Sequence, residues 1–431
     1  MDIWYFFGCR GIDFLKENGI ETYIAINNWI TNFGASIFRN KVLRETQILD
    51  FIDFGNYKIF ENADIQTMIY IIKKSNNISN YKVKYSKLLK DNLSDNELNI
   101  FLDNSQESCF YIKTTLDFCN KQFINDYIYF INSKDDSLLL KIKNGNKIFL
   151  QDEDMAQGIV APQDFLNSKN QKILGKNFSV GESIFVITNE KKKQLNLMEE
   201  EEKIVKPLYT TEELNKYFAN KNNNSWIIYT TSDFKNKSKM FKYPNLKKHL
   251  DRFQKIITSQ YKPYGLHRSR EESFFIGEKI VSLRKCLHPS FTYVDFDSYV
   301  LQTFYIIKPN NINLKYLTGV LNSKLIAYWL KKKGKMQGNN YQIDKGPLMN
   351  IPIYKPNQQQ EKSMVNIVDK ILSISRQSNY YKNIDNQNKV KKYEEQIDIM
   401  VYKLYKLTYE EVLIIDKNFN LSKEEYNNFT Y

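Results

Sequence analysis

The chain has 431 residues, of which 42% are hydrophobic and 26% charged, and this composition is typical of a folded protein with two or three domains. Its formal net charge of +13 favours an acidic partner. No apolar run is long enough to span a membrane, no signal peptide is recognisable, and the four cysteines lie far apart without a CxxC pair. We therefore expect a cytoplasmic protein with reduced thiols, and the three histidines leave little for a metal site.

The first 75 residues alternate between the patterns of helices and strands. Apolar residues three and four apart predict helices, and short apolar runs bounded by glycine or polar residues predict strands. In chain order the predicted elements are a helix over 3–15, a strand over 21–26, a helix over 31–43 and strands over 48–54 and 65–72. The last two strands are expected to form an antiparallel pair with a long connection. This order predicts α/β structure, namely the trailing half of a doubly wound sheet.

Three further segments are expected after this sheet. Residues 76–150 are rich in Asn, Ser, Asp and Lys and are predicted to be a connector with some local structure. Residues 151–355 hold all but one of the nine prolines, and their short, irregularly spaced strands indicate an α+β or mainly β domain. Residues 356–431 return to helical periodicity, which predicts a helical hairpin over 361–405 with a polar linker at 379–392.

Positive charge is concentrated in one segment. Residues 235–285 contain 14 Lys/Arg and 4 Asp/Glu, interleaved with aromatic side chains. A second basic run, Lys331–Lys335, precedes the polar residues Gln337–Tyr341. Lys and Arg contact phosphates, whereas Asn, Gln and Arg can read base edges. We favour nucleic-acid binding over a solvated basic face, because charge concentrated in this way is destabilising through self-repulsion.

The densest recognition candidate is Tyr264–Arg270. Gly265 permits a tight backbone, and in an extended chain Arg268 and Arg270 point to the same side, where both can reach phosphates or guanine edges. The alternative is a structural network in which these arginines pair with Glu271 and Glu272. Over both basic segments the predicted DNA-binding residues are Lys247, Lys248, Arg252, Tyr264, His267, Arg268, Arg270, Arg284, Lys285, Lys331, Lys332, Lys333, Lys335, Gln337, Asn339 and Asn340.

Several motifs of nucleotide chemistry are missing from the chain. There is no GxG turn, which a dinucleotide or S-adenosylmethionine site usually needs after its first strand. The Asn/Asp-Pro-Pro-aromatic loop of DNA amino-methyltransferases is also missing, since the first proline is Pro162 and no two prolines are adjacent. HExxH, GxSxG and P-loop motifs do not occur. The chain alone is therefore not expected to hold a complete catalytic centre.

The remaining motifs resemble the later part of adenine-N6 DNA methyltransferases, most closely the Eco57I-like and TaqI-like modification enzymes. In the first part the resemblance rests on 14–29 (FLKENGIETYIAINNW), 33–34 (FG), 38–39 (FR), 52–55 (IDFG), 58–60 (KIF) and 63–67 (ADIQT). Downstream, a resemblance to the TaqI-like C-terminal specificity domain rests on 321–325 (LNSKL), 334–340 (GKMQGNN), 351–353 (IPI) and 397–405 (IDIMVYKLY).

The resemblance implies a mechanism and a partner. Family members bind duplex DNA and flip the target adenine out of the helix towards S-adenosylmethionine. By motif match, Phe60 stacks on the flipped base, and Asn27, Asn28 and Trp29 line the target pocket beyond the carboxyl end of a strand. In the family the cofactor strand and the Pro-Pro loop precede the position of Met1. The chain is thus expected to be a C-terminal portion that needs a missing N-terminal catalytic half or a separate methyltransferase chain.

Alternatives remain at this point. The gene could be truncated, split or internally started, and the chain could be a non-catalytic specificity subunit that binds duplex DNA and docks onto a separate methyltransferase or endonuclease chain. A general binder of RNA or single strands is a third possibility, and it would show no preference for a duplex site. An unpaired sheet edge would make the isolated chain poorly soluble or dimeric. The recognised sequence cannot be deduced from the residues, because DNA deformation contributes to it.

Overall fold

The computed structural model divides the chain into two compact units. Unit 1 comprises Met1–Gly145 and Trp329–Gln342, and unit 2 comprises Asn146–Tyr328 and Ile343–Tyr431. The residues that the structure describes are 2–60, 62, 65–75, 80–103, 109–130, 133–337 and 340–430. Among them, no helix is both long and apolar enough to cross a membrane.

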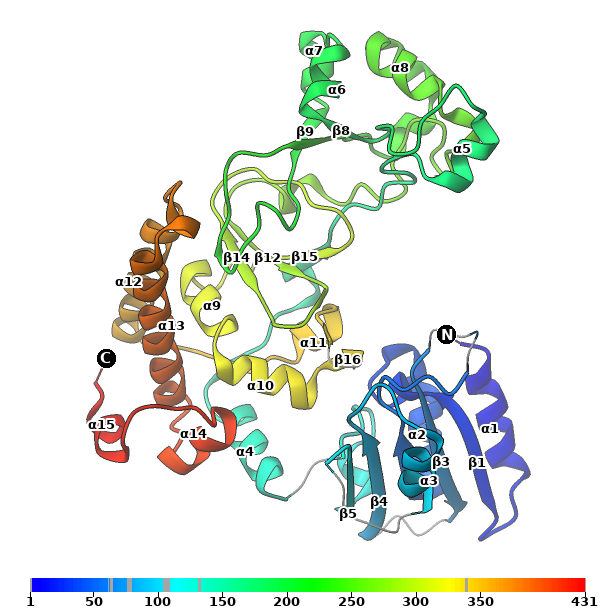
Figure 1. Cartoon of the computed structure of the whole chain (residues 1–431), viewed down its shortest axis with the longest axis vertical. Helices are drawn as coiled ribbons and strands as arrows, with labels where there is room; N and C mark the ends of the chain where they lie inside the picture. Colours follow the sequence, from blue (N-terminus) through cyan, green and yellow to red (C-terminus); the bar gives the residue numbers. More distant parts are fainter. Residues whose placement is uncertain are drawn as a thin grey trace. The chain divides into compact units, whose positions relative to one another are not determined.

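Unit 1 is built on a five-stranded sheet (Figure 1). Its strands are β1 (Ile20–Ile26), β2 (Thr46–Asp53), β3 (Thr67–Lys74), β4 (Tyr81–Leu88) and β5 (Tyr111–Phe118), in the spatial order β1-β3-β2-β4-β5. β3 runs antiparallel between β1 and β2, β2 is parallel to β4, and β4 is antiparallel to β5. The antiparallel β2–β3 pair confirms the pairing predicted from the sequence.

One face of this sheet is covered by two helices. α1 (Trp4–Phe14) and α2 (Ser36–Glu45) bury Ile12, Phe38 and Val42 against alternate residues of β3, such as Tyr70 and Ile72. The alternation arises because successive strand side chains point to opposite faces. On the other face α3 (Asp95–Asp103) contributes a smaller cluster around Phe101, and α4 (Ser133–Lys143) follows β5.

Residues 76–150 contribute more than the expected connector. They supply β4 and β5, two of the five strands of the sheet, so the sheet extends beyond residue 75. The outer faces of these strands carry Lys82, Lys84 and Asp117. Tyr81, Val83 and Tyr85 alternate with Lys82 and Lys84, which is the pattern of a half-buried strand, whereas the polar composition of the whole segment favours a connector.

Unit 2 contains two main sheets and a helical region (Figure 1). The five-stranded sheet has the order β10-β14-β12-β15-β7, and the three-stranded sheet has the order β8-β11-β9. The strands are β6 (Lys147–Ile148), β7 (Met155–Gln157), β8 (Val186–Thr188), β9 (Val205–Leu208), β10 (Tyr217–Phe218), β11 (Ser225–Ile228), β12 (Lys279–Leu283), β13 (Lys285–Cys286), β14 (Phe291–Val294), β15 (Phe304–Ile307) and β18 (Ile353–Tyr354). A shared apolar core runs beneath both sheets, from Ile187 and Ile227 to Val281 and Ile306.

The helices of unit 2 lie along the edges of these sheets and in the C-terminal region. They are α5 (Ser168–Leu174), α6 (Asn189–Gln194), α7 (Glu199–Glu202), α8 (Pro244–Asp251), α9 (Leu314–Leu321), α11 (Lys345–Met349), α12 (Gln358–Ser375), α13 (Ile384–Leu404), α14 (Tyr409–Ile415) and α15 (Lys423–Asn428). α10 (Lys324–Lys333) leads to the short hairpin of β16 (Lys335–Gln337) and β17 (Asn340–Gln342).

The predicted helical hairpin corresponds to α12 and α13. Its linker is shorter than expected, because α13 begins at Ile384, where Asn383 accepts a hydrogen bond from the Asn386 N–H at 3.0 Å. The polar residues up to Lys392 therefore form the exposed first turns of a helix rather than a loop. α12 also packs closely on α9, where Gly319 leaves room for Met364.

Candidate nucleic-acid interface

The loop after β1 contains the predicted pocket residues. It forms the short 3-10 helix η1 (Asn27–Ile30). The Asn27 side-chain amide donates to Asp53 Oδ1 at 3.1 Å, and the Asn27 N–H donates to the carbonyl of Gln66 at 3.0 Å. Asp53 also accepts from the Gly55 N–H at 3.0 Å. Asn27 therefore ties the carboxyl ends of β1 and β2 together.

Asn28 and Trp29 have different environments. The Oδ1 atom of Asn28 is buried and finds no donor among the residues that the structure describes. Trp29 is fully buried, its Nε1 donates to the sulfur of Met68 at 3.0 Å, and its ring lies 5.0 Å from that of Phe38. Trp29 thus belongs to the core beneath the loop, whereas Asn28 presents an unsatisfied polar atom at the end of the strand.

Arg39 of α2 anchors this loop by hydrogen bonds to its backbone carbonyls. Its Nη1 donates to the carbonyls of Trp29 and Asn32, each at 2.9 Å, and its Nε donates to the carbonyl of Asp126 at 2.8 Å. Its guanidinium also lies 5.1 Å from the ring centre of Tyr127. Burial lowers the pKa of Arg39 from its usual value. The sequence indicated Arg39 only as part of the motif at 38–39, and its partner Asp126 lies 87 residues away in the chain.

Phe60, the predicted stacking residue, lies beyond the carboxyl end of β2. The chain turns at Gly55, whose φ is +58°, and reaches Phe60 with 44% of its side chain exposed. An exposed aromatic face is what an unstacked base needs. The neighbouring motif residues Glu61, Ala63 and Asp64 lie outside the described residues.

The fold neutralises part of the basic segment 235–285. Several of the predicted DNA-binding residues form ion pairs: Lys247 with Asp251 at 2.6 Å, Arg252 with Glu182 at 2.6 Å and Arg284 with Asp344 at 2.8 Å. Lys239 pairs with Asp233 at 2.6 Å, and Lys279 is fully buried. These cations are held in place by the protein itself, so each has less charge to offer a phosphate.

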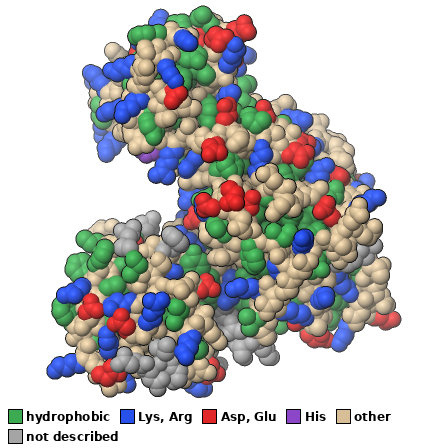
Figure 2. All heavy atoms as spheres, turned by 180° about the vertical axis from the view of Figure 1, so that it is seen from behind, with side chains coloured by type: hydrophobic (Ala, Val, Ile, Leu, Met, Phe, Trp, Pro, Cys, Tyr) green, Lys and Arg blue, Asp and Glu red, His purple; other side chains and the backbone are tan. Residues whose placement is uncertain are grey.

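All other cations of this segment except the half-buried Arg270 are exposed and make no ion pair within the part of the chain that the structure describes. They are Lys235, Lys237, Lys242, Lys248, Lys255, Lys262, Arg268 and Lys285. Figure 2 shows Lys and Arg side chains gathered along the outer side and underside of the lobe that carries α5 and α8. Unpaired, exposed cations are the groups that release counterions when they meet a phosphate backbone.

The segment Tyr264–Arg270 is firmly anchored rather than uniformly exposed. Tyr264 is buried, and its hydroxyl donates to Asp251 Oδ1 at 2.6 Å. Arg268 exchanges backbone hydrogen bonds with Val160 and has an exposed side chain. Arg270 has a φ of +67°, so the chain is not extended through it, and its guanidinium donates to Gln157 Oε1 at 3.0 Å and to the carbonyl of Gly158 at 3.3 Å. The backbone at Arg270 therefore departs from the extended chain that the sequence suggested, and the Arg270 guanidinium is engaged by the protein whereas the Arg268 side chain is exposed.

His267 in the same segment is half-buried. The alternative network is not formed among the described residues, since Glu272 binds Lys206 at 2.9 Å and neither arginine of this segment pairs with Glu271 or Glu272.

The second basic run lies in unit 1. Lys331, Lys332 and Lys333 occupy the last turn of α10, where cations interact favourably with the helix dipole. Tyr129 donates to the carbonyl of Lys333 at 2.5 Å, and the Lys333 Nζ lies 4.2 Å from the Tyr129 ring centre.

The hairpin that follows contacts η1 through β16. Lys335 and Asn340 are half-buried and Gln337 is exposed, with its Oε1 accepting from Gln342 at 2.6 Å. Asn339 lies outside the described residues. The structure thus places polar side chains of the second run beside the loop that holds Asn27 and Asn28.

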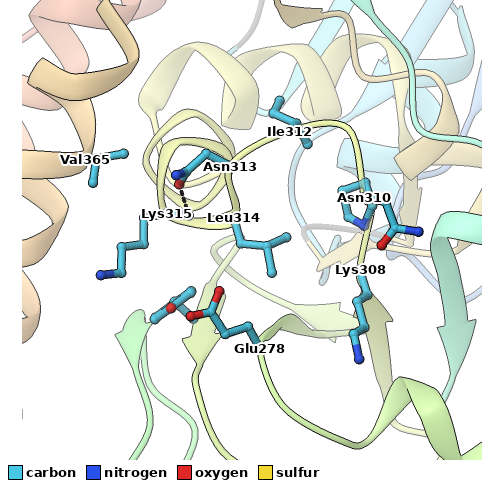
Figure 3. A pocket seen from close by; sticks show the side chains of 10 residues that line it. Glu278, Lys308, Asn310, Ile312, Asn313, Leu314, Lys315 and Val365 are labelled. Carbon is cyan, nitrogen blue, oxygen red and sulfur yellow. Dashed lines mark hydrogen bonds between the residues drawn. The ribbon is translucent and has the colours of Figure 1, made fainter. Parts of the chain in front are cut away.

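A pocket of ≈ 480 Å³ lies beside the N-terminus of α9 (Figure 3). Its cations serve the fold: Lys308 donates to the carbonyls of Ser273 and Ile276, each at 2.7 Å, and Lys315 binds Asp369 at 2.7 Å. The carboxylate of Glu278 faces the same space (Figure 3). Because both lysines are already bound within the protein and Glu278 adds a negative charge, the pocket is poorly suited to an anionic ligand.

The described residues do not form a complete site for S-adenosylmethionine. At the carboxyl ends of β1 and β2 they offer the Asn28 oxygen and the Phe60 ring, whereas Asp53 is already engaged by Asn27 and Gly55. A glycine-rich turn is missing there, so we derive no methyl-transfer step from these residues. Among the described residues, no group of His, Cys, Asp or Glu is placed to hold a metal ion.

Two family models match the chain. The model of the TaqI-like C-terminal specificity domain matches residues 206–353, and that of the Eco57I restriction-modification methylase matches residues 1–60. The resemblance inferred from the sequence motifs is thereby confirmed for both segments. Comparison with curated proteins gives no match.

A solved structure of a restriction–modification enzyme resembles this fold. The type IIL restriction-modification enzyme MmeI, solved in complex with DNA, aligns with a TM-score of 0.59 and 15% identity over 99% of this chain and 52% of that chain. This chain thus spans about half the length of that enzyme, and at this identity the likeness concerns the fold alone. A DrdV–DNA complex (TM-score 0.41, 11% identity, 84% of this chain and 38% of that one) and the type IIG restriction endonuclease BpuSI (0.34, 13%, 94% and 49%) have TM-scores too low to define a shared fold.

Proposed function

We propose that the chain is the C-terminal portion of a site-specific DNA adenine-N6 methyltransferase of a type II restriction–modification system. The observation that supports it most is the order of the matched segments, with a methylase segment at 1–60 followed by a specificity domain at 206–353. In this proposal the strands of unit 1 form the end of the catalytic sheet, and residues 151–355 recognise duplex DNA. The donor is S-adenosylmethionine, bound mainly by residues that this chain does not contain.

The free edge of the unit 1 sheet is a suitable binding surface for a partner of this chain. β1 lies at the end of the strand order and pairs only with β3 among the described strands. Ile20 and Ile24 are exposed on one side of this edge, and Phe7 and Phe14 of α1 are exposed on its other side. Apolar side chains on both sides of an unpaired strand are suited to further strands and covering helices. We therefore place the cofactor-binding half, covalently or non-covalently attached, at β1 and α1.

This edge gives a direct test on the isolated chain. We expect the chain alone to self-associate through β1 and α1, and the double variant Phe7→Glu/Phe14→Glu to sediment as a monomer. The variant Leu287→Glu, which changes an equally exposed apolar residue in unit 2, is the control and should leave self-association unchanged. A monodisperse monomer of the unmodified chain in sedimentation would contradict the assignment of this edge.

Methyl transfer is the decisive test of the function. The chain is mixed with a protein that carries a glycine-rich turn and an Asn-Pro-Pro-aromatic loop, encoded next to it, together with duplex DNA and labelled S-adenosylmethionine. We expect the labelled methyl group to appear on N6 of adenine only when both proteins are present. Methylation of another base would overturn the proposed function. Absence of methylation with every neighbouring protein that carries these motifs would overturn it as well.

The second candidate is a non-catalytic specificity subunit that docks onto a separate methyltransferase or endonuclease chain. The described residues around Asn28 and Phe60, which lack a complete donor site, favour it. This candidate would be supported if the partner chain acted at random DNA sites by itself and at one specific site when this chain was added. Methyl transfer that needs the Phe60 side chain would support the first.

A further inference from the structure

An aromatic side chain stands out within the exposed basic surface of unit 2. Phe241 lies on the 3-10 helix η6 (Lys237–Lys242), and 67% of its side chain is exposed. Lys237 and Lys242 on the same turn are exposed and make no ion pair with any described residue. Lys247 of α8 lies with its Nζ 5.9 Å from the ring centre. Lys247 is itself paired with Asp251, so the unpaired charges on the turn that carries this ring are those of Lys237 and Lys242.

The turn that carries Phe241 is rigidly held. Asn236 Oδ1 accepts hydrogen bonds from the Ser238 N–H at 3.1 Å and the Ser238 hydroxyl at 2.7 Å, which fixes its start. Met240 is fully buried, and its carbonyl accepts from the Tyr243 N–H at 3.0 Å, which fixes its end. Because Met240 fills the core position, the adjacent Phe241 is directed outwards.

Two acidic groups of this lobe are paired with lysines. Asp233 binds Lys239 at 2.6 Å, and in the neighbouring helix α7 Glu202 binds Lys192 at 2.7 Å. Glu201 of α7 is fully buried and binds the start of α8. On the turn that carries Phe241, Lys237 and Lys242 are the unpaired charges, and they attract a polyanion and repel a basic partner.

We propose that η6 is a DNA wedge, in which Phe241 inserts beside or between base pairs while Lys237 and Lys242 bind the flanking phosphates. The proposal rests on duplex DNA being the ligand of this chain. Apolar side chains on a rigid basic support are used in this way, because partial unstacking of a base step is offset by contact with the ring. Phe241 then contributes to the choice of site through the deformability of the base step, without reading a base edge.

The test compares two duplexes of the same length, one fully paired and one with a single central mismatch, since a mismatch weakens stacking and favours insertion. The full chain should bind the mismatched duplex roughly 10-fold more tightly. Phe241→Ala should lose this preference and keep the salt dependence of binding. Lys237→Gln/Lys242→Gln should keep the preference and reduce the slope of log K against log salt by about 2. Phe165→Ala, at another exposed phenylalanine of unit 2, should change neither.

A fluorescence variant provides a second readout. Emission of Phe241→Trp, relative to the unmodified chain, should be quenched when duplex DNA binds, because the introduced indole stacks on a base. Equal binding of both duplexes by the unmodified chain, a preference retained by Phe241→Ala, or unchanged emission of Phe241→Trp in the bound state would each overturn the wedge while leaving duplex binding intact. Failure of the unmodified chain to bind any duplex would overturn the proposed function and the wedge together.

Discussion

Replacing Glu201 should destabilise α8, the helix that carries Lys247 and Lys248. Glu201 is fully buried and accepts four hydrogen bonds, two on each carboxylate oxygen. Its Oε1 accepts from the Asn245 and Leu246 N–H groups at 2.7 and 2.9 Å, which are the second and third residues of α8. Tyr243, at the N-cap position, provides no side-chain cap, so this distant carboxylate takes over the role.

The magnitude follows from this geometry. A hydrogen bond to a charged group is worth about 1.5–3 kcal/mol, and removing one partner from a buried, satisfied arrangement costs roughly 3–5 kcal/mol because the contributions are not additive. We expect Glu201→Ala to lower the free energy of opening α8 by about 3 kcal/mol, which raises amide exchange in residues 244–251 by roughly 100-fold. Because α8 carries Lys247 and Lys248, affinity for duplex DNA should fall as well.

Hydrogen–deuterium exchange of the full chain, read by mass spectrometry of peptides that cover α8, measures this effect. Glu200→Ala is the matched control, since Glu200 is an exposed neighbour whose ion pair with Lys203 should contribute less than about 1 kcal/mol. If exchange at α8 in Glu201→Ala equals that in Glu200→Ala, the capping role assigned to Glu201 is wrong.

Two further predictions concern a buried lysine and the stacking residue. Burial, aided by the charge of Lys308, lowers the pKa of Lys279 to about 7, so the unfolded chain binds more protons between about pH 7 and 10 and stability rises with pH over this window. In urea unfolding, the stability of Lys279→Met relative to the unmodified chain should therefore improve by roughly 3 kcal/mol from pH 10 to pH 6, and a constant difference would contradict this. In a complex with the cofactor-binding half, Phe60→Ala should reduce the fluorescence of flipped 2-aminopurine, and unchanged fluorescence would exclude the stacking role.

The sequence predicted unit 1 well where the apolar pattern was local. The helix expected at 3–15 is α1, and the strands expected at 21–26, 48–54 and 65–72 are β1, β2 and β3, within a few residues. β3 runs between β1 and β2, and this placement depends on long-range pairing that no local pattern encodes. β4 and β5 were not predicted because their short alternating runs lie in a segment rich in Asn, Ser, Asp and Lys, whose composition favours a connector.

The sequence predicted the positive charge of the candidate interface but could not predict which of its side chains are exposed. The excess of positive charge in 235–285 was evident, but which cations stay exposed depends on partners far along the chain, such as Asp344 for Arg284. Similarly, the glutamate run at 199–202 resembles an exposed charged patch, and its buried member Glu201 is distinguished only by contacts with Asn245, 44 residues away. Tertiary contacts, and not residue types, decide these roles.

The proposed function requires that the positively charged surface of this chain binds a double helix. The most direct measurement is equilibrium binding of the full chain to duplex DNA over a range of salt concentrations, with single-stranded DNA and RNA of the same sequence as competitors. We expect preference for the duplex and a linear fall of log K with log salt, with a slope of about −4 or steeper from roughly five phosphate contacts. No measurable affinity for any duplex at low ionic strength, or equal affinity for single strands, would contradict it.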